Sequence, residues 1–181
     1  MENRTWPIRI NTMRLCMSKL CIAYVTKTNT TREIAEEIGK IAREKEWTVK
    51  VLPLTAVTDL REYDAVLIGA PINGMQWLPE ANEFVEKHRK VLSERPTSYF
   101  LVSYLMNSGA QRWRKLIDKS LNKASKLVTP FSIGKFDGRV EDEFGAIPRL
   151  LFGVKKGTPL DLRDWDQIRG WTKDYLEQLQ T

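Results

Sequence analysis

The stretch KLCIAYVTKTNTTREIAEEIGKIA, residues 19–42, contains the pattern that decides the fold. Residues 20–25 form a short and almost continuous apolar run, which is typical of a strand buried on both faces of a parallel sheet. A polar loop follows at residues 26–31, and isoleucine and alanine then recur at the spacing of one helix face. The stretch therefore predicts a strand, a short loop and an amphipathic helix.

The alternation of strand and helix continues along the chain. Strand patterns occupy residues 48–54, 65–70, 98–104 and 127–136, and helical patterns occupy 78–92, 113–124 and the segment from 164 onward. A short helix around residues 148–152 is expected within the less regular segment 141–163. Five strands alternating with helices predict an α/β fold, in which helices cover both faces of a parallel sheet.

Length and composition are those of an ordinary globular protein. The chain has 181 residues, of which 42% are hydrophobic and 29% charged, and no apolar run approaches the roughly 20 residues of a membrane helix. We expect residues 19–181 to form one domain. Residues 1–18 show no clean period and are interpreted as an N-terminal extension, either a loosely packed and disordered arm or residues that precede a natural start at Met17.

Several function classes lose support from the counts of reactive residues. Two cysteines, Cys16 and Cys21, do not form a disulfide framework, which favours a cytoplasmic location. His88 is the single histidine and lies in a helical pattern, so we nominate no metal ligand and no catalytic side chain. The net charge of +6 is spread along the chain without a nucleic-acid-binding motif, and we expect no nucleic-acid partner.

The loop after the first strand is rich in hydroxyl groups. Thr30 and Glu33 have the spacing of a capping box, which predicts Thr30 as the N-cap of the following helix. Exposed N–H groups and the positive end of the helix dipole would then face the loop, and such a place favours a phosphate. The alternative interpretation is an ordinary capped helix in a polar loop.

Two further loops follow the third and fourth strands, at residues 69–77 and 103–109. Each contains an aromatic residue, glycine and backbone donors, so a flat aromatic ligand could stack between them. Ligands of open parallel sheets bind beyond the carboxyl ends of the strands, where these loops would meet. Taken singly, Trp77 could be a hydrophobic residue that caps a helix, and Tyr104 could be a core residue at a strand end.

Two segments carry a resemblance to a known family. Residues 24–35 resemble the first FMN loop of the flavodoxin family, of the form T/S-x-T-G-x-T followed by x-x-I-A, and residues 63–72 are similar to its Y-D-x-x-x-x-G-x-P-I segment. The resemblance implies a flavodoxin-like three-layer sandwich with strand order 2-1-3-4-5 and non-covalently bound FMN. Asn29 stands where the family has glycine, and asparagine tolerates a left-handed backbone better than most residues.

The resemblance also implies which residues bind the cofactor. The phosphate would be held by Thr26, Lys27, Thr28, Asn29, Thr30 and Thr31. The isoalloxazine ring would be flanked by Pro71, Ile72, Asn73, Gly74, Met75, Trp77, Ser103, Tyr104, Met106 and Asn107.

The expected function is that of an FMN-binding redox protein, active in electron transfer or as a small oxidoreductase. Residues 136–140 and 163–171 are similar to a branch that includes the flavodoxin-type protoporphyrinogen oxidases, so an FMN-dependent protoporphyrinogen oxidase or quinone reductase is one alternative. A flavin-free binding or regulatory module on the same fold is the other. The expected partners are a redox donor or acceptor protein or a quinone, with peripheral membrane contact as an option. The oligomeric state is left open.

Overall fold

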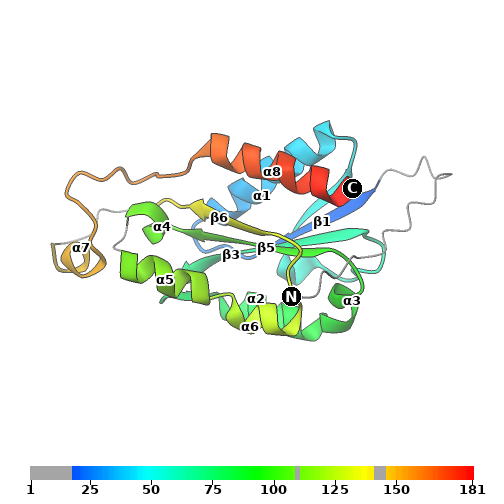
Figure 1. Cartoon of the computed structure of the whole chain (residues 1–181), viewed down its shortest axis with the longest axis horizontal. Helices are drawn as coiled ribbons and strands as arrows, with labels where there is room; N and C mark the ends of the chain where they lie inside the picture. Colours follow the sequence, from blue (N-terminus) through cyan, green and yellow to red (C-terminus); the bar gives the residue numbers. More distant parts are fainter. Residues whose placement is uncertain (1–17, 109–110, 141–145) are drawn as a thin grey trace.

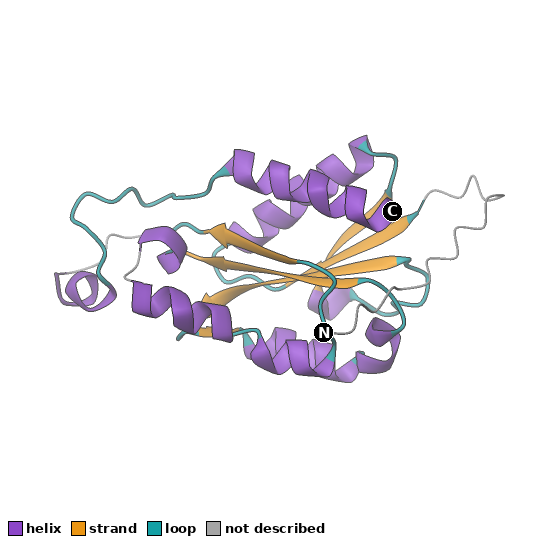
Figure 2. Ribbon diagram, viewed as in Figure 1, coloured by secondary structure: helices purple, strands orange, loops and turns teal. Residues whose placement is uncertain are grey.

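A twisted parallel sheet forms the middle layer of the molecule (Figures 1 and 2). The computed structural model describes residues 18–108, 111–140 and 146–181. The parallel strands are β1 (Lys19–Tyr24), β2 (Thr48–Pro53), β3 (Ala65–Asn73), β5 (Thr97–Ser103) and β6 (Ile133–Asp137). They lie in the order β2-β1-β3-β5-β6, so the predicted order 2-1-3-4-5 is confirmed for these five strands.

A short sixth strand, β4 (Gln76–Trp77), was not predicted. It pairs antiparallel with the end of β3, which extends beyond the predicted strand end at residue 70. The two residues of the connecting turn, Gly74 and Met75, have φ angles of 57° and 63°. Positive φ at both central residues is the signature of a type I′ hairpin turn, whose twist matches that of the paired strands.

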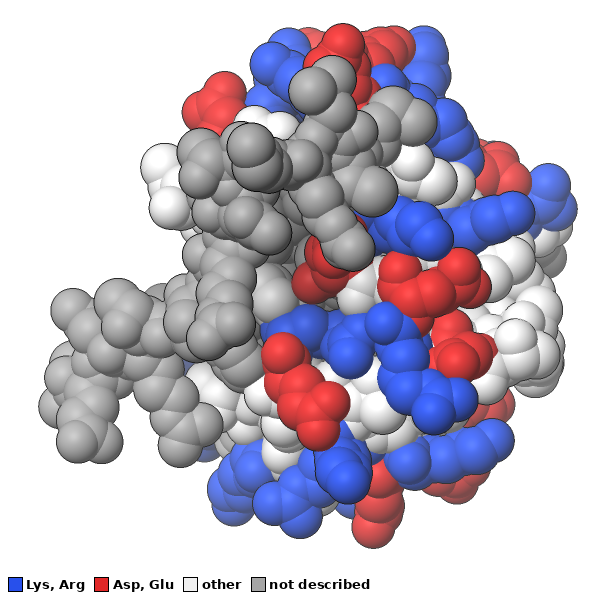
Figure 3. Space-filling view, turned by 90° about the vertical axis from the view of Figure 1, so that its right-hand side faces the viewer, with Lys and Arg blue, Asp and Glu red and all other residues white. Residues whose placement is uncertain are grey.

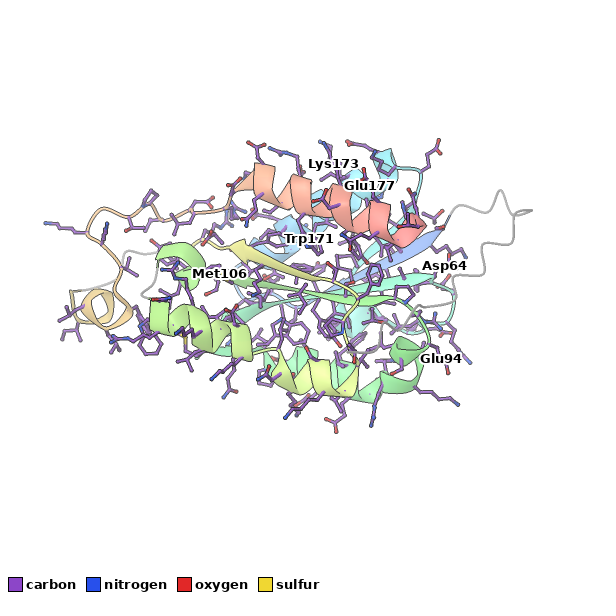
Figure 4. The ribbon with its side chains drawn as sticks, viewed as in Figure 1. Asp64, Glu94, Met106, Trp171, Lys173 and Glu177 are labelled. Atoms are coloured by element: carbon purple, nitrogen blue, oxygen red, sulfur yellow. The ribbon has the colours of Figure 1, made fainter. Side chains whose placement is uncertain are left out.

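Helices cover both faces of the sheet, as predicted (Figure 1). One face carries α1 (Thr30–Glu44) and α8 (Trp165–Gln180), and the other carries α2 (Pro79–Lys87), α3 (Arg89–Ser93), α5 (Gln111–Lys119) and α6 (Asn122–Leu127). The apolar and charged residues of α8 lie on opposite sides of the helix. Trp171 lies toward the sheet, whereas Lys173 and Glu177 lie on the outer side (Figure 4). A hydrophobic core therefore fills the space on each side of the sheet.

Two predicted helices are each divided in the structure, and one predicted strand begins later than expected. The helix expected at 78–92 divides at His88, whose φ of −101° interrupts the helical backbone, and the helix expected at 113–124 divides into α5 and α6. The fifth strand was expected from residue 127 but begins at Ile133. Pro130 explains this difference, since proline lacks a donor for a strand ladder and restricts the residue before it.

The carboxyl edge, which we define as the edge of the sheet where the parallel strands end, carries two short helices. They are α4 (Leu105–Ser108) and α7 (Ala146–Phe152), and both lie at the left of Figure 1. A single-turn 3-10 helix, η1 (Leu54–Ala56), follows β2. The predicted extension, residues 1–18, falls outside the described residues except for Ser18, whose carbonyl oxygen accepts a bond of 2.9 Å from the Thr48 N–H.

A close approach between two central strands requires one glycine. Gly69 in β3 pairs with Phe100 in β5. A Cβ atom added to Gly69 would lie 1.9 Å from the Phe100 ring carbon Cζ, a separation that side-chain atoms do not reach. The glycine therefore leaves room for the Phe100 ring, which fills the core beside β3.

Candidate functional site

The β1–α1 loop, residues 26–31, is the loop predicted to hold a phosphate, and it lies at the carboxyl edge. The predicted N-cap at Thr30 is wrong, because Asn29 occupies that position and its side chain makes no capping hydrogen bond. Asn29 has φ 58° and ψ −9°, which is the left-handed conformation expected of a residue in the family's glycine position. Thr30 is the first helical residue, and its Oγ1 lies 3.1 Å from Oγ1 of Thr28.

Two hydroxyl groups of the β1–α1 loop are buried without a hydrogen-bond partner among the described residues. They are Oγ1 of Thr26 and Oγ1 of Thr31. Other buried threonines are satisfied: Thr97 donates to Leu92 O at 2.8 Å, and Thr172 donates to Ile168 O at 2.7 Å. Because a buried hydroxyl without a partner is costly, the loop contains two donors that a bound anion could satisfy.

The start of α1 adds backbone donors to the same place. The first-turn N–H groups of a helix have no partner within the helix, and the dipole makes this end positive. Lys27 is exposed in the loop and adds a positive charge. Hydroxyl groups, N–H groups and a lysine together form a donor set that suits a phosphate.

The acidic residue in the first turn of α1 is bound by two arginines. Nη2 of Arg139 donates to Oε1 of Glu33 at 2.9 Å, and Nη1 of Arg163 binds Oε2. Arg163 also donates to Asp161 at 2.6 Å, and its side chain is only 6% exposed. Hydrogen bonds from Arg163 hold the pKa of Asp161 below its usual value. Glu33 is thus paired by the arginines and is not the second member of a capping box.

This Arg–Glu network was missed by the sequence analysis. In the sequence, residues 136–140 and 163–171 show only a resemblance to one branch of the family. Arg139 lies 106 residues from Glu33 and Arg163 lies 130 residues away, so no local spacing indicates the contact. Backbone bonds bring the two segments together, since Val140 N–H donates to Leu160 O at 2.9 Å and Leu162 N–H donates to Gly138 O at 3.2 Å.

The loop after β3 is only partly accessible. Pro71, Ile72 and Met75 are half-buried, and Asn73 and Gly74 are exposed. Trp77 is 1% exposed, and its ring packs against Tyr99 with 5.3 Å between the centroids. The Trp77 ring is therefore packed in the core, and its place beside a ligand stays a prediction.

The loop after β5 is mostly buried. Ser103, Tyr104 and Met106 are each less than a tenth exposed, and the Tyr104 hydroxyl donates to Pro159 O at 2.8 Å. Met106 lies in α4 at the carboxyl edge (Figure 4). Asn107 is also in α4, but its side chain is outside the described part of the structure. The three predicted loops do share one edge, because they follow the adjacent strands β1, β3 and β5.

Comparison with known families identifies the class of protein. The flavodoxin domain matches residues 21–144, which is more than half of the chain. The chain therefore belongs to the flavodoxin family, as the sequence resemblance indicated. No curated protein matches the sequence.

Solved structures share the fold at low sequence identity. Oxidised flavodoxin 1 from Bacillus cereus is 17% identical with a TM-score of 0.59, over 90% of this chain and 99% of that chain. A Fusobacterium nucleatum flavodoxin mutant bound to flavin mononucleotide is 14% identical with a TM-score of 0.52, over 90% and 98%. The rubredoxin oxygen:oxidoreductase of Desulfovibrio gigas is 15% identical with a TM-score of 0.57, over 90% and 36%. These likenesses establish the flavodoxin-like fold.

Proposed function

We propose that this protein binds FMN non-covalently at the carboxyl edge and acts as a redox protein, in electron transfer or as a small oxidoreductase. The observation that carries the proposal is the pair of buried hydroxyl groups of Thr26 and Thr31, which have no partner within the described residues. A phosphate would accept hydrogen bonds from both groups. The left-handed backbone at Asn29 and the start of α1 beside it are consistent with this assignment.

Each loop has a separate role in this proposal. Residues 26–31 hold the phosphate, and the accessible part of the β3–β4 loop, residues 71–75, borders the isoalloxazine ring together with residues 103–107. Trp77 supports the β3–β4 loop from the core. When bound, FMN supplies the redox chemistry, and the protein orients the ring and excludes water. No acid or base side chain is assigned, since electron transfer needs none.

A titration tests this proposal. Purified, cofactor-free protein is added to FMN and, separately, to riboflavin, and the flavin fluorescence is recorded. We expect quenching of FMN, with at least about tenfold tighter binding than riboflavin, because each hydrogen bond to a charged phosphate contributes about 1.5–3 kcal/mol. Absence of quenching would overturn the proposal and favour the flavin-free binding module on the same fold.

A quinone reductase or protoporphyrinogen oxidase activity is the second candidate. It is favoured by Ile147 and Leu150, which expose 82% and 84% of their surface on α7 at the carboxyl edge. An exposed apolar surface suits an enzyme that binds a hydrophobic substrate more than it suits a small protein that only carries electrons. Quinone-dependent turnover by the FMN-loaded protein would support this candidate. If the loaded protein instead reduces a redox partner protein but no quinone, the electron-carrier role is favoured. A cytoplasmic location remains part of the proposal.

A further inference from the structure

Helix α7 exposes a set of apolar side chains. Ile147, Leu150 and Leu151 are 82%, 84% and 51% exposed, and their spacing of three and four residues places them on one helix face. Amphipathic helices of globular proteins normally pack such a face against the core. On α7 this face is directed to solvent instead, which makes it a candidate interaction surface.

The carboxyl end of α7 is attached to α5. Arg112 Nη2 and Trp113 Nε1 both donate to Leu151 O, at 2.7 Å and 3.0 Å. The Phe152 ring contacts Trp113 edge-on, with 5.4 Å between the ring centroids. These contacts fix α7 beside α5 at the carboxyl edge (Figure 1) while its apolar side chains remain uncovered.

Cationic residues are frequent on α5, which α7 contacts, and in the segment that follows α7. Residues 111–119 and 141–160 contain seven Lys and Arg against four Asp and Glu, and three of these acids, at 141–143, lie outside the described residues. Four of these cations are exposed and form no ion pair with another described residue: Arg114, Lys115, Lys155 and Lys156. Leu116 is a further exposed apolar residue, at 42%, on α5, the helix to which α7 is attached.

The opposite edge of the sheet has a different charge pattern. Figure 3 shows that edge, and there Lys and Arg alternate with Asp and Glu among the residues drawn in colour. Among the residues drawn in colour, the opposite edge therefore does not share the excess of unpaired cations found on the described parts of α5 and of the segment after α7. An apolar face bordered by cations is complementary to an interface that has anionic headgroups above hydrocarbon.

We propose that this surface, formed by Ile147, Leu150, Leu151, Leu116 and the neighbouring Lys and Arg residues, docks the protein on an anionic lipid bilayer. The leucine and isoleucine side chains enter the acyl boundary, and the cations bind lipid phosphates. None of the described helices is long and apolar enough to cross a membrane. The inference does not depend on flavin binding.

Vesicle flotation of the full chain tests the proposal. The probes are vesicles of phosphatidylcholine alone and of phosphatidylcholine with an equal part of phosphatidylglycerol. We expect at least about tenfold stronger binding to the anionic vesicles, and weaker binding at high salt. Ile147→Ser with Leu150→Ser should lower anionic binding about tenfold or more, and Lys155→Glu with Lys156→Glu should do the same.

Matched variants at distant positions are the controls. Ile133→Ser replaces a residue that is 37% exposed at the start of β6, and Lys87→Glu with Lys90→Glu makes the same charge change on α2 and α3. We expect both to bind as the unchanged protein does. If the serine pair does not fold, the glutamate pair in the segment after α7 gives the same readout. Equal binding to both vesicle types, no binding, or binding unaffected by the α7 substitutions would overturn the proposal and leave this face as a contact for an acidic protein.

Discussion

Arg139, which follows β6, donates a 2.9 Å hydrogen bond to Glu33 in the first turn of α1, across 106 residues of sequence. Arg163 binds the second oxygen of the same carboxylate. The segment after β6 is thereby attached to the start of α1, next to the β1–α1 loop. Glu33 would otherwise place an uncompensated negative charge next to the proposed phosphate position, and the two arginines offset it.

Removing the charge of Glu33 should destabilise the protein. We expect Glu33→Gln to lower the free energy of unfolding by about 1–2 kcal/mol, a value between those of exposed and buried ion pairs, because Arg163 is almost fully buried. Urea denaturation measures this change. Glu36→Gln is the matched control on the same helix, since its pair with Arg32 is half-exposed on both sides. The control should change by less than about 0.5 kcal/mol. Equal losses of stability in the two variants would contradict the claim that the Glu33 ion pairs stabilise the protein more than the exposed Glu36–Arg32 pair.

Acid should weaken the attachment of the segment after β6. The pKa of Asp161 is lowered by hydrogen bonds from Arg163, so this carboxylate contributes stability above its unfolded pKa of about 3.9. That contribution is lost as the pH falls through the lowered folded pKa. We expect Asp161→Asn to flatten the loss of thermal stability below about pH 4. Asp174→Asn, on the exposed side of α8, is the control, and a similar flattening in both variants would count against the assignment.

The left-handed conformation of Asn29 predicts different changes in stability for substitution by glycine and by alanine. Asn29→Gly should leave stability unchanged or slightly higher, because glycine adopts positive φ without steric cost. Asn29→Ala should lower the free energy of unfolding by about 1 kcal/mol, because alanine does not tolerate that conformation. Thermal denaturation of the two variants distinguishes these outcomes. If the alanine variant were as stable as the glycine variant, the assigned backbone conformation would be wrong.

Two glycines should respond oppositely to alanine. Gly69→Ala would drive a methyl group into the Phe100 ring, and we expect a loss of about 3 kcal/mol or more, partly recovered by adding Phe100→Leu. Gly170 lies in α8 with no heavy atom within 4 Å of an added Cβ. Gly170→Ala should therefore stabilise the helix by up to about 1 kcal/mol. Chemical denaturation measures both, and a stable Gly69→Ala variant without the second substitution would contradict the packing.

The sequence predicts the sheet and the position of the site because their signals are local. A continuous apolar run such as residues 20–25 indicates a buried strand, and the alternation of such runs with helical patterns predicts a parallel sheet. The strand order follows from the family resemblance. In a parallel sheet of that order, the loops after β1, β3 and β5 lie side by side at one edge. The left-handed backbone at Asn29 was also predictable, from the residue type in a glycine position.

Other features depend on contacts that no local pattern encodes. The burial of Trp77 follows from the hairpin that β4 makes with β3, and a two-residue strand gives almost no periodic signal. Arg139 and Arg163 reach Glu33 only because residues 138–140 lie beside residues 160–162. The exposed apolar face of α7 likewise has the pattern of a buried helix, and only the structure shows that it is uncovered.

The most direct test of the account compares FMN with riboflavin on the unchanged protein and on a variant with Thr26→Val and Thr31→Val. Valine keeps the shape of threonine but removes the two unpartnered hydroxyl groups, so the cofactor-free protein should be as stable as before or more stable. We predict that FMN binding weakens by about tenfold or more while riboflavin binding is unchanged. Thr97→Val, which removes a satisfied hydroxyl at the other end of the sheet, should lower stability without this selective loss. Equal weakening of FMN and riboflavin, or no change in either, would contradict a phosphate site in the loop between β1 and α1.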